Sequence, residues 1–144
     1  MDNYIIYPIG KIETRGDKTV LRIYGEYREG LLGIEEFSHL IVYFWFDRND
    51  TPEGRAVLKV HPRKDPAIPL HGVFATRSPL RPNLIGMSIC RIISVGPQMI
   101  EVDRIDALDD TPILDIKPYI PQSDAVPDAV VPDWIHRPWP RNKN

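Results

Sequence analysis

Apolar residues in this chain gather in short runs that glycine, proline and polar turn residues separate, and no run continues as a helical stripe. The chain has 144 residues, of which 15 are proline and nine are glycine. Proline in a helix interior removes a backbone hydrogen bond and clashes with the preceding turn. The pattern therefore predicts an all-β protein with little helix.

Six or seven segments have the length and composition of β-strands. The run "SHLIVYFWF", residues 38–46, is apolar or aromatic at nearly every position, so we expect a strand buried on both faces. Gly96-Pro97 predicts the turn of a hairpin. An antiparallel barrel or sandwich follows, with at most one helical turn near residues 34–37. The predicted strands are residues 4–13, 19–24, 38–46, 56–60, 86–95, 98–105 and 111–117.

Overall composition is that of a soluble globular protein, with 42% hydrophobic and 26% charged residues. No segment approaches the roughly 18 uninterrupted apolar residues of a membrane span. The start, "MDNYIIYPIGKIE", lacks the basic region and cleavage site of a signal peptide, so we expect a cytoplasmic protein. The single cysteine, Cys90, cannot form an internal disulfide, and we expect it to be buried in a strand. No metal-ligand spacing is present, so we expect no metal site.

Charge is distributed unevenly around a net value of -2. From Glu101 onward nine acidic residues face five basic ones. Such a division is either a striped solvated surface or a site for an anionic ligand. Between residues 55 and 91 only Asp65 is acidic, and seven residues are basic: Arg55, Lys59, Arg63, Lys64, Arg77, Arg81 and Arg91.

Two of these arginines lie in a stretch stiffened by prolines, "GVFATRSPLRPNLIGMS", residues 72–88. Pro79 and Pro82 exclude a helix and favour extended backbone at the residues before them. Arg77 and Arg81 are thus held on a chain with little conformational entropy to lose when a ligand binds. Guanidinium groups suit carboxylates and phosphates, and Asn83 adds a donor and an acceptor. Alternatively, these side chains cap strand ends and pair with the acidic part of the chain.

Most familiar enzyme motifs are absent. The chain has no Gly-x-Gly-x-x-Gly unit for a dinucleotide, no Walker loop, no Gly-x-Ser-x-Gly elbow and no His-Glu-x-x-His. His39, at the start of the apolar run, is interpreted as a hydrogen-bonded structural residue. The aromatic residues 43–46 could stack a nucleobase, but core packing is the simpler interpretation.

The arginine stretch, together with "DALDDTPILDIKPYIP" at residues 106–121, resembles the TrmO family, formerly grouped with TsaA and VirR-like proteins. "PIGKIE" and "GIEEFSHLIVYFWF" extend the resemblance from about Pro8 to Pro121. The family implies a compact antiparallel β-barrel that acts as a homodimer and binds S-adenosylmethionine. Its reaction methylates the N6 nitrogen of threonylcarbamoyl-adenosine next to the anticodon of tRNA.

The resemblance also implies a set of site residues. Arg77 suits the cofactor's carboxylate, Asp106 suits ribose hydroxyls and Met87 suits adenine. Arg81 and Asn83 are expected to contact substrate, and Asp106 or Asp109 is the candidate acceptor of the N6 proton. The full set of expected cofactor residues is Asp47, Arg48, Arg77, Met87, Asp103, Arg104, Ile105 and Asp106.

Three positions depart from the family pattern. Leu84 stands where a second proline is usual, Asp110 stands where "LDGTP" has glycine, and Asp47-Arg48 replaces His-Gln. The last departure weakens the assignment of Asp47 and Arg48.

The region after the barrel also departs from longer relatives, which carry a C-terminal domain there. We expect a barrel domain at residues 1–121 and an extended, proline-rich C-terminal tail at 122–144, pinned by Trp134 and Trp139. Methylation of tRNA is therefore one of three possible functions. The others are a methyltransferase with a different acceptor and a non-catalytic S-adenosylmethionine-binding regulatory module.

Overall fold

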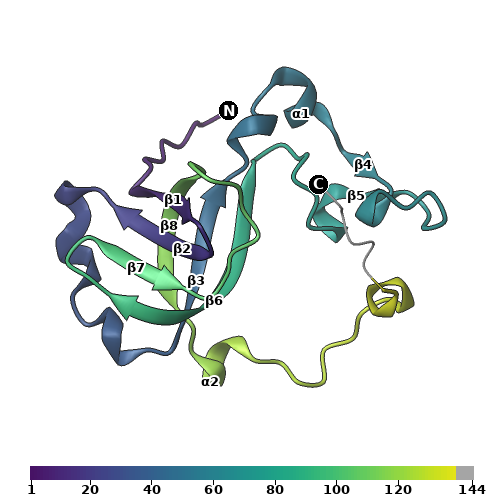
Figure 1. Cartoon of the computed structure of the whole chain (residues 1–144). Helices are drawn as coiled ribbons and strands as arrows, with labels where there is room; N and C mark the ends of the chain where they lie inside the picture. Colours follow the sequence, from purple (N-terminus) through teal and green to yellow (C-terminus); the bar gives the residue numbers. More distant parts are fainter. Residues whose placement is uncertain (139–144) are drawn as a thin grey trace.

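A closed six-stranded barrel forms the body of the protein (Figure 1). The computed structural model describes residues 1–138. Strands pair antiparallel in the order β1-β2-β7-β6-β3-β8, and β1 also pairs with β8, which closes the ring. The all-β prediction is confirmed. The barrel strands are β1 Gly10–Arg15, β2 Lys18–Ile23, β3 His39–Trp45, β6 Ile85–Val95, β7 Met99–Val102 and β8 Pro112–Pro118.

Strand β3 differs from its prediction, because only one of its faces is buried. Leu40, Val42 and Phe44 point into the barrel and are at most 2% exposed. The alternate residues Ile41, Tyr43 and Trp45 face outward and are half-buried. Side chains alternate across any strand, so a wholly apolar strand in a single-layer barrel must present half of its residues on the outer surface.

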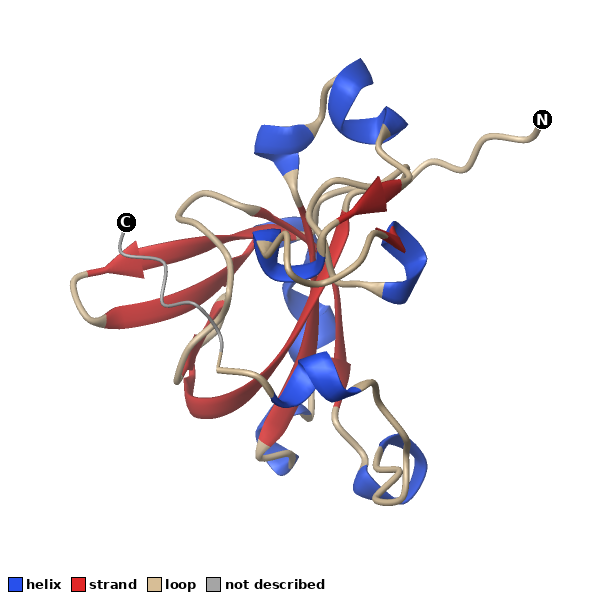
Figure 2. Cartoon of the chain, turned by 90° about the vertical axis from the view of Figure 1, so that its right-hand side faces the viewer, coloured by secondary structure: helices blue, strands red, loops and turns tan. Residues whose placement is uncertain are grey.

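The first predicted strand begins too early. Strand β1 starts at Gly10, and residues 1–9 have no regular structure. Figure 2 shows this N-terminal segment extending away from the barrel. Tyr4 and Tyr7 are 89% and 64% exposed, and Pro8 lacks the N–H that a sheet ladder needs. Apolar composition alone therefore extended the predicted strand too far toward the N-terminus, where Ile9 bonds to Ile113 of β8 but residues 4–8 are not part of the sheet.

The later strands agree with the prediction, except that β7 ends at Val102 and not at residue 105. The β6–β7 hairpin turns at Gly96-Pro97, where the N–H of Gly96 donates to the carbonyl of Met99 at 2.7 Å. A register shift between Ile92 and Ser94 bends the long strand β6, as β-bulges do at barrel corners. The core inside the ring consists of Ile12, Leu21, Ile23, Leu40, Val42, Phe44, Cys90, Ile100, Val102 and Ile113.

Residues 47–84 form an excursion between β3 and β6, here called the lobe, which projects from the barrel (Figure 1). Its two strands pair only with each other, and Leu84, Val73 and Ile68 are its most buried apolar side chains. The predicted strand at 56–60 is shorter, because Thr51 caps a helix by accepting from the N–H of Gly54. The lobe contains η3 Asp47–Asn49, α1 Pro52–Ala56, β4 Lys59–Val60, η4 Pro62–Lys64, β5 His71–Gly72 and η5 Val73–Ala75.

The remaining helices are all short. A seven-residue 3-10 helix, η1 Gly25–Leu31, was not predicted, whereas η2 Ile34–Glu36 was. In the tail, α2 Pro121–Asp124 and η6 Asp133–His136 interrupt an otherwise extended chain. Trp139 lies outside the described residues. None of the helices within residues 1–138 has the length and apolar character needed to cross a membrane.

Candidate functional site

Several predicted site residues meet at one end of the barrel, where β1 and β3 end and β6 and β8 begin. Arg48, in η3 just after β3, donates from Nη2 to the carbonyl of Asp109 at 2.8 Å. The carboxylate of Asp109 accepts from the N–H of Thr14, near the end of β1, also at 2.8 Å. Asp109 therefore joins three elements, and the sequence contained no sign of its contact with Thr14.

The segment 103–109 crosses this end of the barrel from β7 to β8. At its start, Asp103 Oδ1 accepts from the N–H groups of Arg91 and Arg104, each at 2.8 Å. The bond from Arg91 is the main cause of a lowered pKa at Asp103. Further on, the N–H of Asp106 lies 3.4 Å from Ser88 Oγ. These bonds give Asp103 a structural role that needs no ligand, while the side chain of Asp106 has no bonding partner within residues 1–138.

The arginine loop, residues 76–84, is held by its own side chains. The hydroxyl of Thr76 accepts from the N–H of Ser78, and the hydroxyl of Ser78 accepts from the N–H of Leu80, each at 3.2 Å. Arg81 Nη1 donates to the carbonyls of Thr76 and Ser78 at 3.2 and 3.0 Å. Arg81 thus stiffens the loop. It does not pair with acidic residues, which was the alternative interpretation of the sequence.

Arg77 differs from Arg81 in the same loop, because its side chain makes no hydrogen bond within the loop. Its side chain is exposed, and it has no hydrogen-bonding or ionic partner among residues 1–138. Asn83 is also exposed. A rigid loop that presents a single open guanidinium suits an anionic group such as a carboxylate.

Arg55 fastens the loop to the barrel. Its Nε donates to Asp50 at 2.7 Å, its Nη1 donates to the carbonyl of Pro82 at 3.2 Å, and its guanidinium lies 5.2 Å from the ring centroid of Trp45. The bond from Arg55 is the main cause of a lowered pKa at Asp50. The sequence placed Arg55 in the basic stretch but did not indicate this role.

Met87 lies near the same end, on the outer face of β6, opposite Tyr43 of β3. Its side chain is 40% exposed and can offer an apolar surface to a ligand. On the inner face Cys90 is fully buried, as predicted, and burial raises the pKa of its thiol to about 11. Cys90 is therefore not a reactive nucleophile in the folded protein.

The structure explains two of the three departures from the family pattern. Asp110 has a φ of +64°, a left-handed conformation that glycine adopts freely and aspartate tolerates, and its carboxylate lies 3.3 Å from Lys11 Nζ. Leu84 is fully buried, and its carbonyl accepts from the N–H of Phe46 at 2.8 Å. Asp110 thus adopts the backbone conformation of the usual glycine, and Leu84 fills a buried apolar position.

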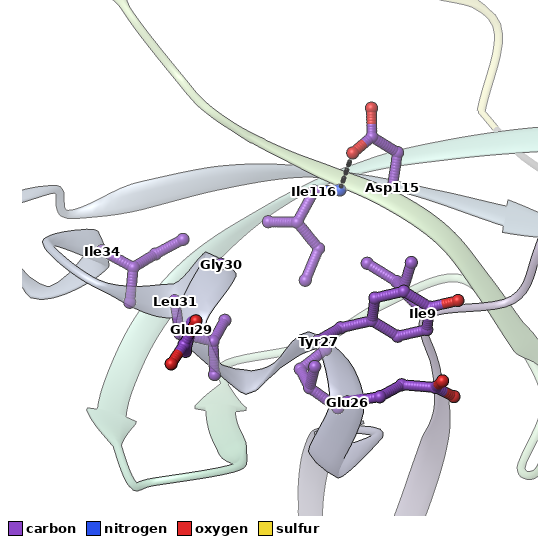
Figure 3. A pocket seen from close by; sticks show the side chains of 10 residues that line it. Ile9, Glu26, Tyr27, Glu29, Gly30, Leu31, Ile34, Asp115 and Ile116 are labelled. Carbon is purple, nitrogen blue, oxygen red and sulfur yellow. Dashed lines mark hydrogen bonds between the residues drawn. The ribbon is translucent and has the colours of Figure 1, made fainter.

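A pocket of about 370 Å³ lies elsewhere, between η1 and the barrel (Figure 3). Its lining includes Tyr27 and Ile116 as well as the acidic residues Glu26 and Glu29. None of the predicted cofactor residues lines it. Within residues 1–138 no group of three or more His, Cys, Asp and Glu side chains is arranged to hold a metal ion.

Solved structures share this architecture. The crystal structure of TrmO from Pseudomonas aeruginosa superposes with a TM-score of 0.72 at 30% identity, covering 93% of this chain and 62% of that one. A second crystal structure of TrmO gives 0.71 at 33% identity, with 90% and 64% covered. This chain therefore spans less than two thirds of the length of either solved protein.

Sequence comparisons point the same way. A probable S-adenosyl-L-methionine-binding protein of Methanocaldococcus jannaschii is 50% identical over 114 residues, which cover 79% of this chain and 90% of that protein. Another, from Pyrococcus horikoshii, is 46% identical over 113 residues, covering 78% and 79%. The family model of the tRNA-methyltransferase O N-terminal domain matches residues 6–125. The chain belongs to the TrmO family.

Proposed function

We propose that this protein is an S-adenosylmethionine-dependent methyltransferase that acts in the cytoplasm on tRNA, at N6 of threonylcarbamoyl-adenosine. Its family supports the reaction class. The observation that carries the proposal is that the Arg48–Asp109 contact and the segment containing Asp106 lie at the barrel end where the arginine loop leads into β6.

The residues at this end fit the parts of the cofactor. Arg77 would bind its carboxylate, the side chain of Asp106 would bind ribose hydroxyls, and Met87 would contact adenine. When bound, the cofactor supplies a methyl group activated by a sulfonium. The protein's own task is to align the acceptor nitrogen and exclude water, so no covalent nucleophile is needed and neither Cys90 nor Ser88 takes part in the chemistry.

The acceptor nitrogen must also lose a proton, for which a carboxylate is suited. Of the two candidates, Asp109 is committed through its carboxylate to Thr14 and through its carbonyl to Arg48. Asp106 uses only its backbone N–H, toward Ser88. Asp106 is therefore favoured over Asp109, either as the proton acceptor or as the ribose ligand.

The lobe offers the basic surface for the RNA backbone, although fewer cations are open than the sequence suggested. Arg55, Arg63 and Arg81 donate to groups of the protein itself. Lys59, Lys64 and Arg77 are exposed and have no partner among residues 1–138. We assign the phosphate contacts to Lys59 and Lys64, which leaves Arg77 for the cofactor.

A homodimer is part of the proposal, and the outer face of β3 and β6 is its interface. Three cross-strand pairs line up there: Ile41 with Ile89, Tyr43 with Met87, and Trp45 with Ile85. The adenine contact proposed for Met87 would therefore lie at the edge of this interface. Ile85 and Ile89 are 45% and 51% exposed, which makes this a contiguous apolar patch of the kind that marks protein–protein contacts.

Calorimetric titration with S-adenosylmethionine tests cofactor binding directly. Arg77→Ala should lower the affinity by about 1.5–3 kcal/mol, because a charged hydrogen bond to the carboxylate is lost. Arg28→Ala is the matched control, since Arg28 is exposed on η1, away from the arginine loop. If folded wild-type protein fails to bind millimolar cofactor, the methyltransferase proposal is wrong.

Turnover separates the proposal from the two alternatives. Labelled cofactor is incubated with the protein and total RNA from cells that lack the gene. Label in tRNA supports the proposed substrate, while label in protein or small metabolites keeps the enzyme and replaces the acceptor. Binding without any transfer would identify a regulatory module instead.

A further inference from the structure

The C-terminal tail returns to the molecule at one point, on the lobe. Arg63 of η4 donates to three backbone carbonyls in and just after η6: those of Trp134 at 3.1 Å, Ile135 at 2.9 Å and Arg137 at 2.8 Å. A guanidinium fork at this position satisfies the carbonyls that a helix end leaves open. The docked segment lies beyond residue 125, where the family model ends.

Trp134 makes the second part of this contact. Its ring lies 5.6 Å from the guanidinium of Arg63 and 5.5 Å from the ring of His71, which it meets edge to face. Trp134 is half-buried, whereas every other residue from 121 to 138 is exposed. The tail is therefore a strap, fixed to the barrel at β8 and to the lobe at η6 (Figure 1).

The lobe needs such support at its outer end. Strands β4 and β5 are two residues long each, and a hairpin of this size is marginal without further packing. The contacts of Arg55 and Arg48 fix the lobe only where it leaves the barrel. Trp134 and Arg63 hold the opposite side, at η4 and β5.

This support reaches the cofactor site through a short stretch of chain. His71 of β5, which contacts Trp134, lies six residues before Arg77. Between them the N–H of Val73 donates to the carbonyl of Leu58 at 2.9 Å. The N–H of Thr76 in turn donates to the carbonyl of Val73 at 3.1 Å. A displacement of β5 would therefore shift the arginine loop.

We propose that Trp134 and Arg63 are positioning residues: the strap holds the lobe so that Arg77 is directed to the cofactor's carboxylate. The inference rests on the proposed function for its ligand. The docking of the strap on β5 and η4 can be measured without any ligand, so this inference and the proposed function can fail separately.

The test uses the full chain and two measurements. Trp134→Ala should speed amide hydrogen exchange at residues 59–64 and 71–76, and should weaken S-adenosylmethionine binding by about three- to tenfold. Trp134→Phe keeps a ring against Arg63 and His71 and should restore both. Val130→Ser is the control, because Val130 lies on the same strap and is 94% exposed. With cofactor saturating, turnover of Trp134→Ala should stay near the wild-type value.

A double-mutant cycle identifies the route. In an Arg77→Ala background, Trp134→Ala should cause little further loss of affinity, because both changes remove the same interaction. Arg63→Ala should reproduce the effects of Trp134→Ala. The proposal is overturned if Trp134→Ala speeds amide exchange in the lobe yet leaves cofactor affinity unchanged. It is also overturned if the affinity lost in Trp134→Ala adds fully to the affinity lost in Arg77→Ala. Unchanged exchange in the lobe would instead show that the strap gives no support, whatever the protein binds.

Discussion

Two aspartates three residues apart have different environments. Asp103 is bound by two backbone N–H groups, which lower its pKa and account for its presence. Asp106 leaves its carboxylate open within the described residues. The sequence grouped 103–106 as one cofactor segment, and that assignment stays a prediction. The sequence could not separate the two roles, because it does not show which backbone N–H groups lie near each carboxylate.

Asp106→Asn distinguishes ribose binding from proton transfer. If the carboxylate holds ribose, the dissociation constant of the cofactor should rise while turnover at saturation is kept. If it accepts the N6 proton, turnover should fall by about 10²–10⁴-fold at saturation. Calorimetry and single-turnover kinetics measure the two quantities, and normal values of both would remove Asp106 from the site.

Among the elements, β3 and β6 show what a sequence pattern can and cannot predict. The position of β3 was predicted from its apolar run, but its outer face was not, since the burial of a strand depends on the number of sheet layers. At Gly86 of β6, the rings of Phe44 and Phe46 occupy the space that a Cβ would need.

Gly86→Ala should therefore destabilise the barrel by about 1–3 kcal/mol through overpacking against Phe44, which is only 2% exposed. Urea denaturation followed by circular dichroism measures the change. Gly30→Ala is the control, because an added Cβ meets no atom within 4 Å there. Equal losses from the two substitutions would contradict the crowding argument.

At the scale of the whole molecule, the barrel was predictable and the lobe was not. Alternating strands and turn residues indicate a sheet, and the family resemblance implied that the sheet closes into a barrel. The lobe depends on individual contacts, such as those of Arg55 with Trp45 and of Arg63 with the tail. Proline-rich composition predicted an extended tail pinned by Trp134, but it could not identify the residues that Trp134 contacts.

The proposed dimer interface gives a prediction at the same scale. Ile89→Glu places a charge in the middle of the apolar patch, so a dimer should become a monomer of 16.6 kDa. Light scattering across a range of concentrations measures the mass. Leu32→Glu is the control, at a residue 94% exposed and away from the patch. A wild-type protein that is already monomeric at high concentration would refute this interface.

The closure of the ring by β8 has a consequence for synthesis. Strand β8 pairs with β1 on one side and β3 on the other, yet it is the last barrel strand to leave the ribosome. Until residue 118 emerges, β1 and β3 each have an unpaired edge, which is the kind of edge that recruits other chains. The nascent protein therefore passes through a stage open to aggregation, and joining β1 to β8 across about 100 residues costs about 4 kcal/mol of chain entropy. Ile12 and Ile113, buried where the seam closes, supply the apolar contact that offsets this cost.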